Sequence, residues 1–127
     1  MAGNGQLAQL CHRHSIVLIT VFGSVLDDNR TPRDLDIAVM FEFTAVPDMF
    51  AVVDELMDVT DVASIDVMEL NRAGVVARDQ ALALSEPLYE AEKGLYASQQ
   101  IAAALRRMDT DWLRRLDLEL MAAGRRP

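Results

Sequence analysis

The stretch SIVLITVFGSVLDDNRTPRDLDIAVMF, residues 15–41, decides the fold of this chain. It begins with a short apolar run, 16–22, rich in β-branched side chains, which predicts a strand buried on both faces. Gly23 and Ser24 end this strand. A second strand over residues 34–41 follows after a polar loop that contains Asp, Asn and Pro. The stretch therefore predicts two neighbouring strands joined by a loop.

Asp34 and Asp36 give the second strand its chemistry. Side chains alternate between the two faces of a strand, so these carboxylates share one face, roughly 6–7 Å apart along the strand. Two like charges at this distance favour a shared cation, and Mg²⁺ prefers carboxylate and phosphate oxygens. Gly23 lets the backbone approach a phosphate, and the Ser24 hydroxyl can bind phosphate oxygens. Together these residues predict a nucleotide site.

Each motif alone has a simpler interpretation. A Gly-Ser pair is most often an ordinary turn, and an Asp-x-Asp pair is more often a solvated strand edge. When both occur at strand ends with nine residues between them, they favour the nucleotide site.

A third acidic residue lies on a strand expected over residues 63–70. Asp66 shares a face of this strand with apolar neighbours, and an unpaired carboxylate is costly to bury there. A metal ion held jointly with the aspartates of the second strand would offset that cost. The alternative is that Asp66 lies at a solvated strand end. Glu69 is a second candidate, although it lies on the opposite face.

The pattern of Gly-Ser, nine residues, Asp-x-Asp and a later acidic strand residue resembles the polymerase β-like nucleotidyltransferase superfamily. The short chain looks like the minimal nucleotidyltransferases, many of which are antitoxins of HEPN-domain toxins. The resemblance covers residues 7–90. It implies an α/β fold with a small mixed sheet flanked by helices, which we expect on one face of the sheet.

Carried over by position, the resemblance assigns Gly23 and Ser24 to the triphosphate of ATP. It assigns Asp34 and Asp36 to two Mg²⁺ ions, and Asp66 to the metal ion that helps activate an acceptor hydroxyl. The implied reaction transfers AMP from ATP to a hydroxyl of a cognate toxin. The alternatives are a non-catalytic antitoxin that neutralises the toxin by binding it, and modification of a small molecule, for which an added substrate-binding domain is not evident.

The loop over residues 25–33 departs from the family pattern. Relatives often have Arg or Lys and Gly shortly after Gly-Ser, whereas this loop has Asp27 and Asp28. Acidic side chains beside a triphosphate weaken its binding unless they point to solvent. Arg30 and Arg33 are the candidates for the missing positive charge. Otherwise the loop is solvated, with weak pairs between its acids and arginines.

Composition and charge limit the class of protein. The chain of 127 residues is 51% apolar and 25% charged, as in an ordinary globular domain. It contains no apolar stretch of membrane-spanning length and no signal peptide, so we expect a cytoplasmic protein. Residues 1–91 contain 15 acidic and 5 basic side chains, which would repel a nucleic-acid backbone. Cys11 is the single cysteine and is expected to be inert packing.

Apolar residues at helical spacing predict three helices around the strands. The first covers residues 5–14, and the second begins near Pro47. The third covers residues 73–84, with Asn71 as its N-cap. A proline-containing edge strand is expected over residues 87–90.

Residues 1–92 are expected to form the nucleotidyltransferase core, and residues 93–127 a helical extension of the same domain. The apolar stripe of the extension predicts a helical pair or one kinked helix, with Asp109 or Thr110 as the second cap. This segment either packs on the domain's own sheet or binds a second copy or a toxin, with Trp112 as an anchor.

Overall fold

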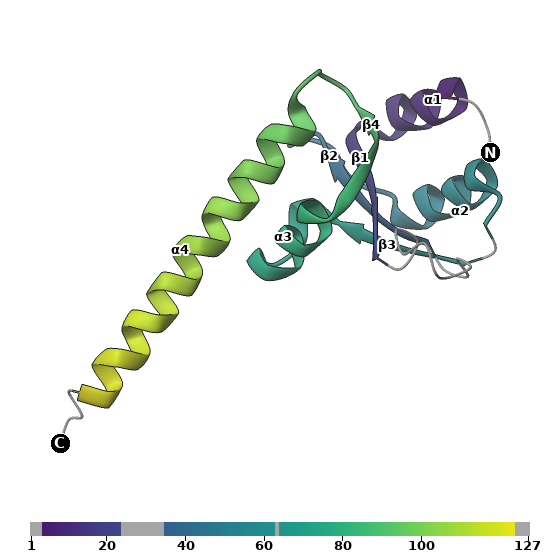
Figure 1. Cartoon of the computed structure of the whole chain (residues 1–127). Coiled ribbons are helices and arrows are strands. Elements are labelled where there is room, and N and C mark those ends of the chain that lie inside the picture. Colours follow the sequence, from purple (N-terminus) through teal and green to yellow (C-terminus); the bar gives the residue numbers. More distant parts are fainter. Residues whose placement is uncertain (1–3, 24–34, 63, 124–127) are drawn as a thin grey trace.

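The computed structural model of the chain describes residues 4–23, 35–62 and 64–123. Its elements are, in order, α1 (Asn4–His14), β1 (Ile16–Phe22), β2 (Leu35–Phe41), α2 (Met49–Thr60), β3 (Ile65–Glu69), the 3-10 helix η2 (Leu70–Arg72), α3 (Val75–Ala83), β4 (Ser85–Glu90) and α4 (Leu95–Ala123) (Figure 1). Within these ranges, no helix is both long enough and apolar enough to cross a membrane.

The four strands form one mixed sheet in the order β3-β2-β1-β4. The apolar strand β1 lies inside the sheet and pairs antiparallel with both β2 and β4, whereas β2 and β3 run parallel. Strand β4 lies at an edge and contains Pro87, which a central strand would not tolerate. The mixed sheet and the proline-containing edge strand confirm the fold class predicted from the sequence.

Helices cover both faces of the sheet, so the expectation of helices on one face was wrong. Ile19 of β1 and Ile37 of β2 belong to a core cluster with α1 and α2. Their sequence neighbours, Leu18 of β1 and Ala38 of β2, point to the opposite face, into a second core cluster with α3 and α4. Figure 1 shows the two helix pairs on opposite sides of the sheet. Because β1 is covered on both faces, five of its seven residues are buried.

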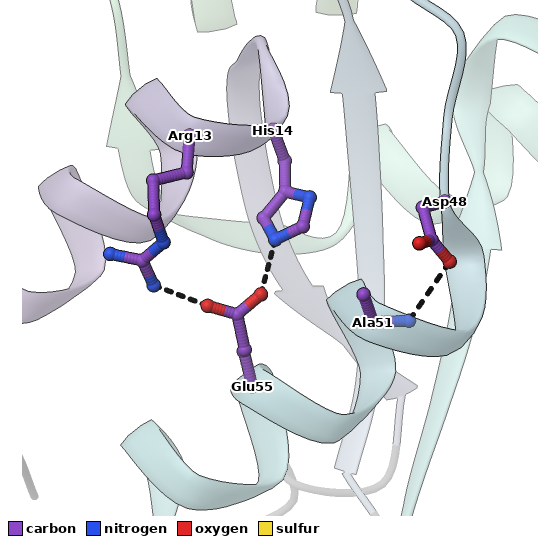
Figure 2. A network of polar contacts seen from close by, with 5 residues as sticks. All are labelled: Arg13, His14, Asp48, Ala51 and Glu55. Carbon is purple, nitrogen blue, oxygen red and sulfur yellow. Dashed lines mark hydrogen bonds and ion pairs between the residues drawn. The ribbon is translucent and has the colours of Figure 1, made fainter.

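A charged network joins α1 to α2 on the first face (Figure 2). Glu55 of α2 accepts hydrogen bonds from Arg13 and from the Nε2 atom of His14, both at the end of α1. These bonds hold the pKa of Glu55 below its usual range, with the Arg13 bond as the largest cause and the His14 bond next. At the start of the same helix, Asp48 caps the N-terminus by accepting from the amide of Ala51.

The sequence analysis predicted Asn71 as the N-cap of α3, and this prediction was wrong. The helix begins at Val75 with Gly74 as its N-cap. The Asn71 side chain instead bonds the main chain at the end of β2: it accepts from the amide of Phe41 at 2.9 Å and donates to the carbonyl of Phe41 at 3.0 Å. The residue thereby extends the contact between the ends of β2 and β3.

The C-terminal segment forms one helix of 29 residues, and not a helical pair. Neither Asp109 nor Thr110 acts as a cap, because residues 95–123 contain no glycine or proline that would interrupt the helix. Its first part packs on the domain. Tyr96 donates from its hydroxyl to the carbonyl of Ser85, and Arg107 pairs with Asp79 of α3 at 3.0 Å. Its second part projects away from the sheet (Figure 1).

Candidate active site

Two of the three predicted carboxylates lie opposite each other on neighbouring strands. Asp36 of β2 and Asp66 of β3 are register partners in the parallel pair. Register partners in a parallel sheet point to the same face, so both side chains lie on the face covered further along by α3 and α4. The position of Asp66 on the face expected for it therefore agrees with the sequence analysis.

Burial falls along this face toward the two carboxylates. Ala38, two residues beyond Asp36 on β2, is fully buried in the cluster with α3 and α4. Asp36 itself is half-buried, and Asp66 is exposed. The pair therefore lies at the margin of the core, where solvent reaches the carboxylates. Asp66 is at a solvated strand end, so desolvation alone does not demand a metal ion beside it.

Gly23 lies directly against the Asp36 carboxylate. It follows β1 with φ of +82°, a conformation that favours glycine. A Cβ atom built at this position would lie 3.1 Å from Cγ of Asp36 and would collide with its Oδ2 atom. Phe22, the preceding residue, is the register partner of Asp36 in the antiparallel pair. The end of β1 and the start of β2 thus place a close-approach glycine beside a carboxylate.

The other predicted site residues lie outside the described part of the chain. These are Ser24, Arg30, Arg33 and Asp34. Among the described residues, no group of three or more His, Cys, Asp or Glu side chains is arranged to hold a metal ion. The roles predicted for all of these positions therefore remain predictions.

Glu69 lies away from this pair. Its register partner is Val39, and it follows the alternation that puts Ile65 and Val67 on the face of α1 and α2. Its carboxylate lies 3.8 Å from Nε of Arg72. Glu69 is thus placed on the opposite face, as the sequence analysis expected of this second candidate.

A concave surface, which the sequence analysis did not identify, lies at the C-terminal ends of β2 and β3, away from Asp36 and Asp66. It has a volume of about 720 Å³, and its lining includes Glu69, Asn71 and Arg72. Three apolar side chains are almost fully exposed there: Phe43 and Val46 of the β2–α2 segment, and Phe50 in the first turn of α2. These residues have the i, i+3, i+7 spacing typical of buried residues on one helix face, so the sequence pattern did not distinguish them from core residues.

Comparison with known proteins identifies a family. The family model described as polymerase beta, nucleotidyltransferase matches residues 5–94. This range includes β1, β2, β3 and β4, with Gly23, Asp36 and Asp66. No curated protein matches the chain.

Several solved structures have a similar fold over nearly their whole length. A chain of a toxin–antitoxin complex with AMP-PNP has a TM-score of 0.70 at 17% identity, over 95% of this chain and 99% of that chain. An MntA toxin–antitoxin mutant, in which two aspartates two positions apart are replaced by glutamate, gives 0.69 at 17% identity, with 95% and 99% covered. A complex of tri-AMPylated Shewanella oneidensis HEPN toxin with MNT antitoxin gives 0.66 at 18% identity, with 94% and 96% covered. The likeness establishes a shared fold.

Proposed function

Because the chain belongs to the polymerase β nucleotidyltransferase family, we propose that it is an antitoxin that transfers AMP from ATP to a hydroxyl of a cognate HEPN-type toxin. The main support is the register pairing of Asp36 with Asp66 beside the close-approach glycine at the end of β1. A pair of carboxylates next to a glycine turn suits a triphosphate with its cations, as the sequence pattern predicted.

The proposed reaction exchanges a phosphoanhydride bond of ATP for a phosphoester bond to the toxin. The toxin hydroxyl oxygen forms a bond to the α-phosphorus of ATP, the bond from that phosphorus to the bridging oxygen of the β-phosphate breaks, and pyrophosphate leaves. The hydroxyl proton passes to solvent. Gly23 and Ser24 hold the β- and γ-phosphates, and Arg30 and Arg33 supply positive charge beside them.

Asp34, Asp36 and Asp66 are the residues that would hold Mg²⁺. The donor set fits, because Asp36 and Asp66 are carboxylates facing one way on adjacent strands and at least one of them is accessible to solvent. When bound, Mg²⁺ neutralises charge on the phosphate oxygens and lowers the pKa of a nearby hydroxyl. The carboxylates also position the acceptor hydroxyl relative to the phosphate chain.

Two features of the similar complexes support the choice of donor and acceptor. One was crystallised with AMP-PNP, an analogue of ATP, and one contains an AMPylated HEPN toxin. The aspartates replaced in the mutant complex have the same spacing as Asp34 and Asp36. The similarity covers almost all of this chain.

The test is transfer of label from α-³²P-ATP to the toxin encoded beside this chain. We expect labelled toxin with the wild-type chain and Mg²⁺, and a loss of at least about 100-fold for Asp36→Asn and for Asp66→Asn. Asp58→Asn, an exposed carboxylate on α2, is the matched control and should retain full activity. Equal label with Asp36→Asn and with the wild-type chain would refute the proposed site.

The second candidate function is a non-catalytic antitoxin. It is favoured by Asp27 and Asp28, which follow the Gly-Ser turn where relatives often carry basic residues. The same experiment separates the two functions. Stable capture of the toxin without label under any metal or nucleotide condition would support the binding antitoxin and contradict the enzyme.

A further inference from the structure

Helix α4 carries an apolar surface that the domain does not cover. Its side chains are each 37–65% exposed although all are large and apolar. We call this set the α4 stripe; it consists of Ile101, Leu105, Met108, Trp112, Leu116 and Leu120. Exposed apolar patches of this extent on soluble proteins mark interaction sites.

The α4 stripe faces away from the domain. Successive residues of an α-helix are rotated by about 100°, so the six members of the stripe fall within an arc of about 120°. Ala103, which is 2% exposed and packs on the second core cluster, points in nearly the opposite direction. The domain's own helices therefore pack against the face of α4 opposite the stripe. Figure 1 shows the C-terminal part of α4 extending beyond α3.

We propose that the α4 stripe is a homodimer interface, in which α4 of one copy packs antiparallel on α4 of a second copy. A two-fold dimer requires a surface that is complementary to itself. Met108, Trp112, Leu116 and Leu120 form a ridge with a constant spacing of four residues. Such a ridge is symmetric about its midpoint, so antiparallel pairing sets Trp112 beside Leu116 and Met108 beside Leu120 of the partner.

The charge distribution favours a second copy over a charged partner. The whole chain has a net charge of −8, but α4 contains four arginines and four acidic residues and is neutral. Two acidic copies would therefore meet along α4, a helix without net charge, where their mutual repulsion is smallest. Antiparallel pairing also places the two acidic domains at opposite ends of a helix about 43 Å long.

The area of the stripe suits a reversible dimer. Each of the four ridge side chains exposes roughly 100 Å², so their pairing would bury about 400 Å² per copy and about 800 Å² in total. This value lies below that of standard specific interfaces, so we expect a weak dimer with dissociation in the micromolar range. The inference does not depend on the proposed transfer reaction.

The experiment is sedimentation equilibrium of the full chain, combined with tryptophan emission over a dilution series. Trp112 is the sole tryptophan and lies in the stripe. We expect a dimer whose dissociation on dilution coincides with a red shift of the emission. Met108→Glu should raise the dissociation constant by at least about 10-fold, with unchanged helix content by circular dichroism.

Leu118→Glu is the matched control. Leu118 is on the same helix and is 59% exposed, close to the 65% of Met108, but it lies off the stripe. It should dimerise like the wild-type chain. A monomeric wild-type chain at all concentrations, including one that pairs only with a toxin, would overturn the proposal. A dimer that Met108→Glu and Leu118→Glu leave equally intact would also overturn it.

Discussion

Gly23 shows how much of the candidate site depends on a single residue. Its φ of +82° and its contact with the Asp36 carboxylate both exclude a side chain. We predict that Gly23→Ala lowers the free energy of unfolding by about 2–3 kcal/mol and displaces Asp36, because the new methyl group meets both penalties. Urea denaturation measures the first effect, and nucleotide transfer the second.

Gly94 provides the control for this substitution. It has a φ of +95°, but a Cβ atom there would meet no described atom within 4 Å. Gly94→Ala should therefore show the conformational cost alone, about 1 kcal/mol, without loss of transfer activity. Equal losses for the two variants would mean that the contact with Asp36 contributes nothing.

Thr20 is a buried polar residue in the middle of β1. It is fully buried, and within the described part of the chain its hydroxyl has no hydrogen-bond partner. We predict that Thr20→Val raises the free energy of unfolding by about 1 kcal/mol, since it replaces an unpaired hydroxyl by a methyl group of similar shape. Chemical denaturation of the purified variant tests this. Thr20→Ser, which keeps the hydroxyl, should be less stable than the wild-type chain.

At the scale of elements, the bonds of Glu55 to Arg13 and His14 couple α1 and α2 through a titrating group. The pKa of Glu55 is lower in the folded chain than its ordinary value, so its contribution to stability is complete above about pH 4.3 and is lost as the pH falls further. We predict that Glu55→Gln lowers stability by about 1 kcal/mol at pH 7, a modest value because the side chain is partly exposed.

The pH dependence provides the check on this coupling. Thermal denaturation of the two proteins should show a difference that shrinks steadily below about pH 4.3. Asp54→Asn, which removes an exposed charge from the same helix, serves as the control. A difference between the wild-type chain and Glu55→Gln that stays constant down to pH 3 would contradict the assignment.

Elements with a strong local pattern were predictable from the sequence. The apolar run 16–22 is β1 as predicted, and the proline-containing strand is at an edge. Asn71 was misread because a good capping residue at a turn can equally bond a neighbouring strand, and only the fold brings Phe41 within reach. The covering of both faces also depends on long-range packing, which local patterns do not contain.

The candidate site was likewise predictable only in part from the sequence. Alternation along one strand placed Asp66 on its correct face, and the structure adds that Asp36 is its register partner. Register between β2 and β3 depends on the intervening helix and loops, so no local pattern gives it. The contact of Gly23 with Asp36 is likewise a product of strand pairing.

At the scale of the whole molecule, α4 consists of an anchored part and a projecting part. The anchored part includes Tyr96, whose hydroxyl bonds Ser85, and Arg107, which pairs with Asp79. Ala103, which lies between these two residues in the sequence, is buried in the core cluster with α3. We predict that a chain ending at Met108 has a free energy of unfolding within about 1 kcal/mol of that of the full chain, because it keeps these contacts. The comparison is made at concentrations where both chains are monomeric.

Truncation before α4 gives the opposite result. A chain ending at Gly94 loses the buried face of the helix and leaves Leu82 and Ser85 without their α4 partners. Its unfolding free energy should fall by more than about 3 kcal/mol in the same denaturation experiment. Equal stability of the two truncated chains would show that α4 does not support the domain.

Both edge strands of the sheet disfavour pairing with a strand of another molecule. Pro87 in β4 lacks an amide hydrogen, and the opposite border is the five-residue β3, which carries Asp66 and Glu69. Short borders with proline or charge disfavour the stacking of chains into amyloid-like fibrils. This protein should therefore tolerate high concentrations without cross-β aggregation, even though its projecting helix exposes large apolar side chains.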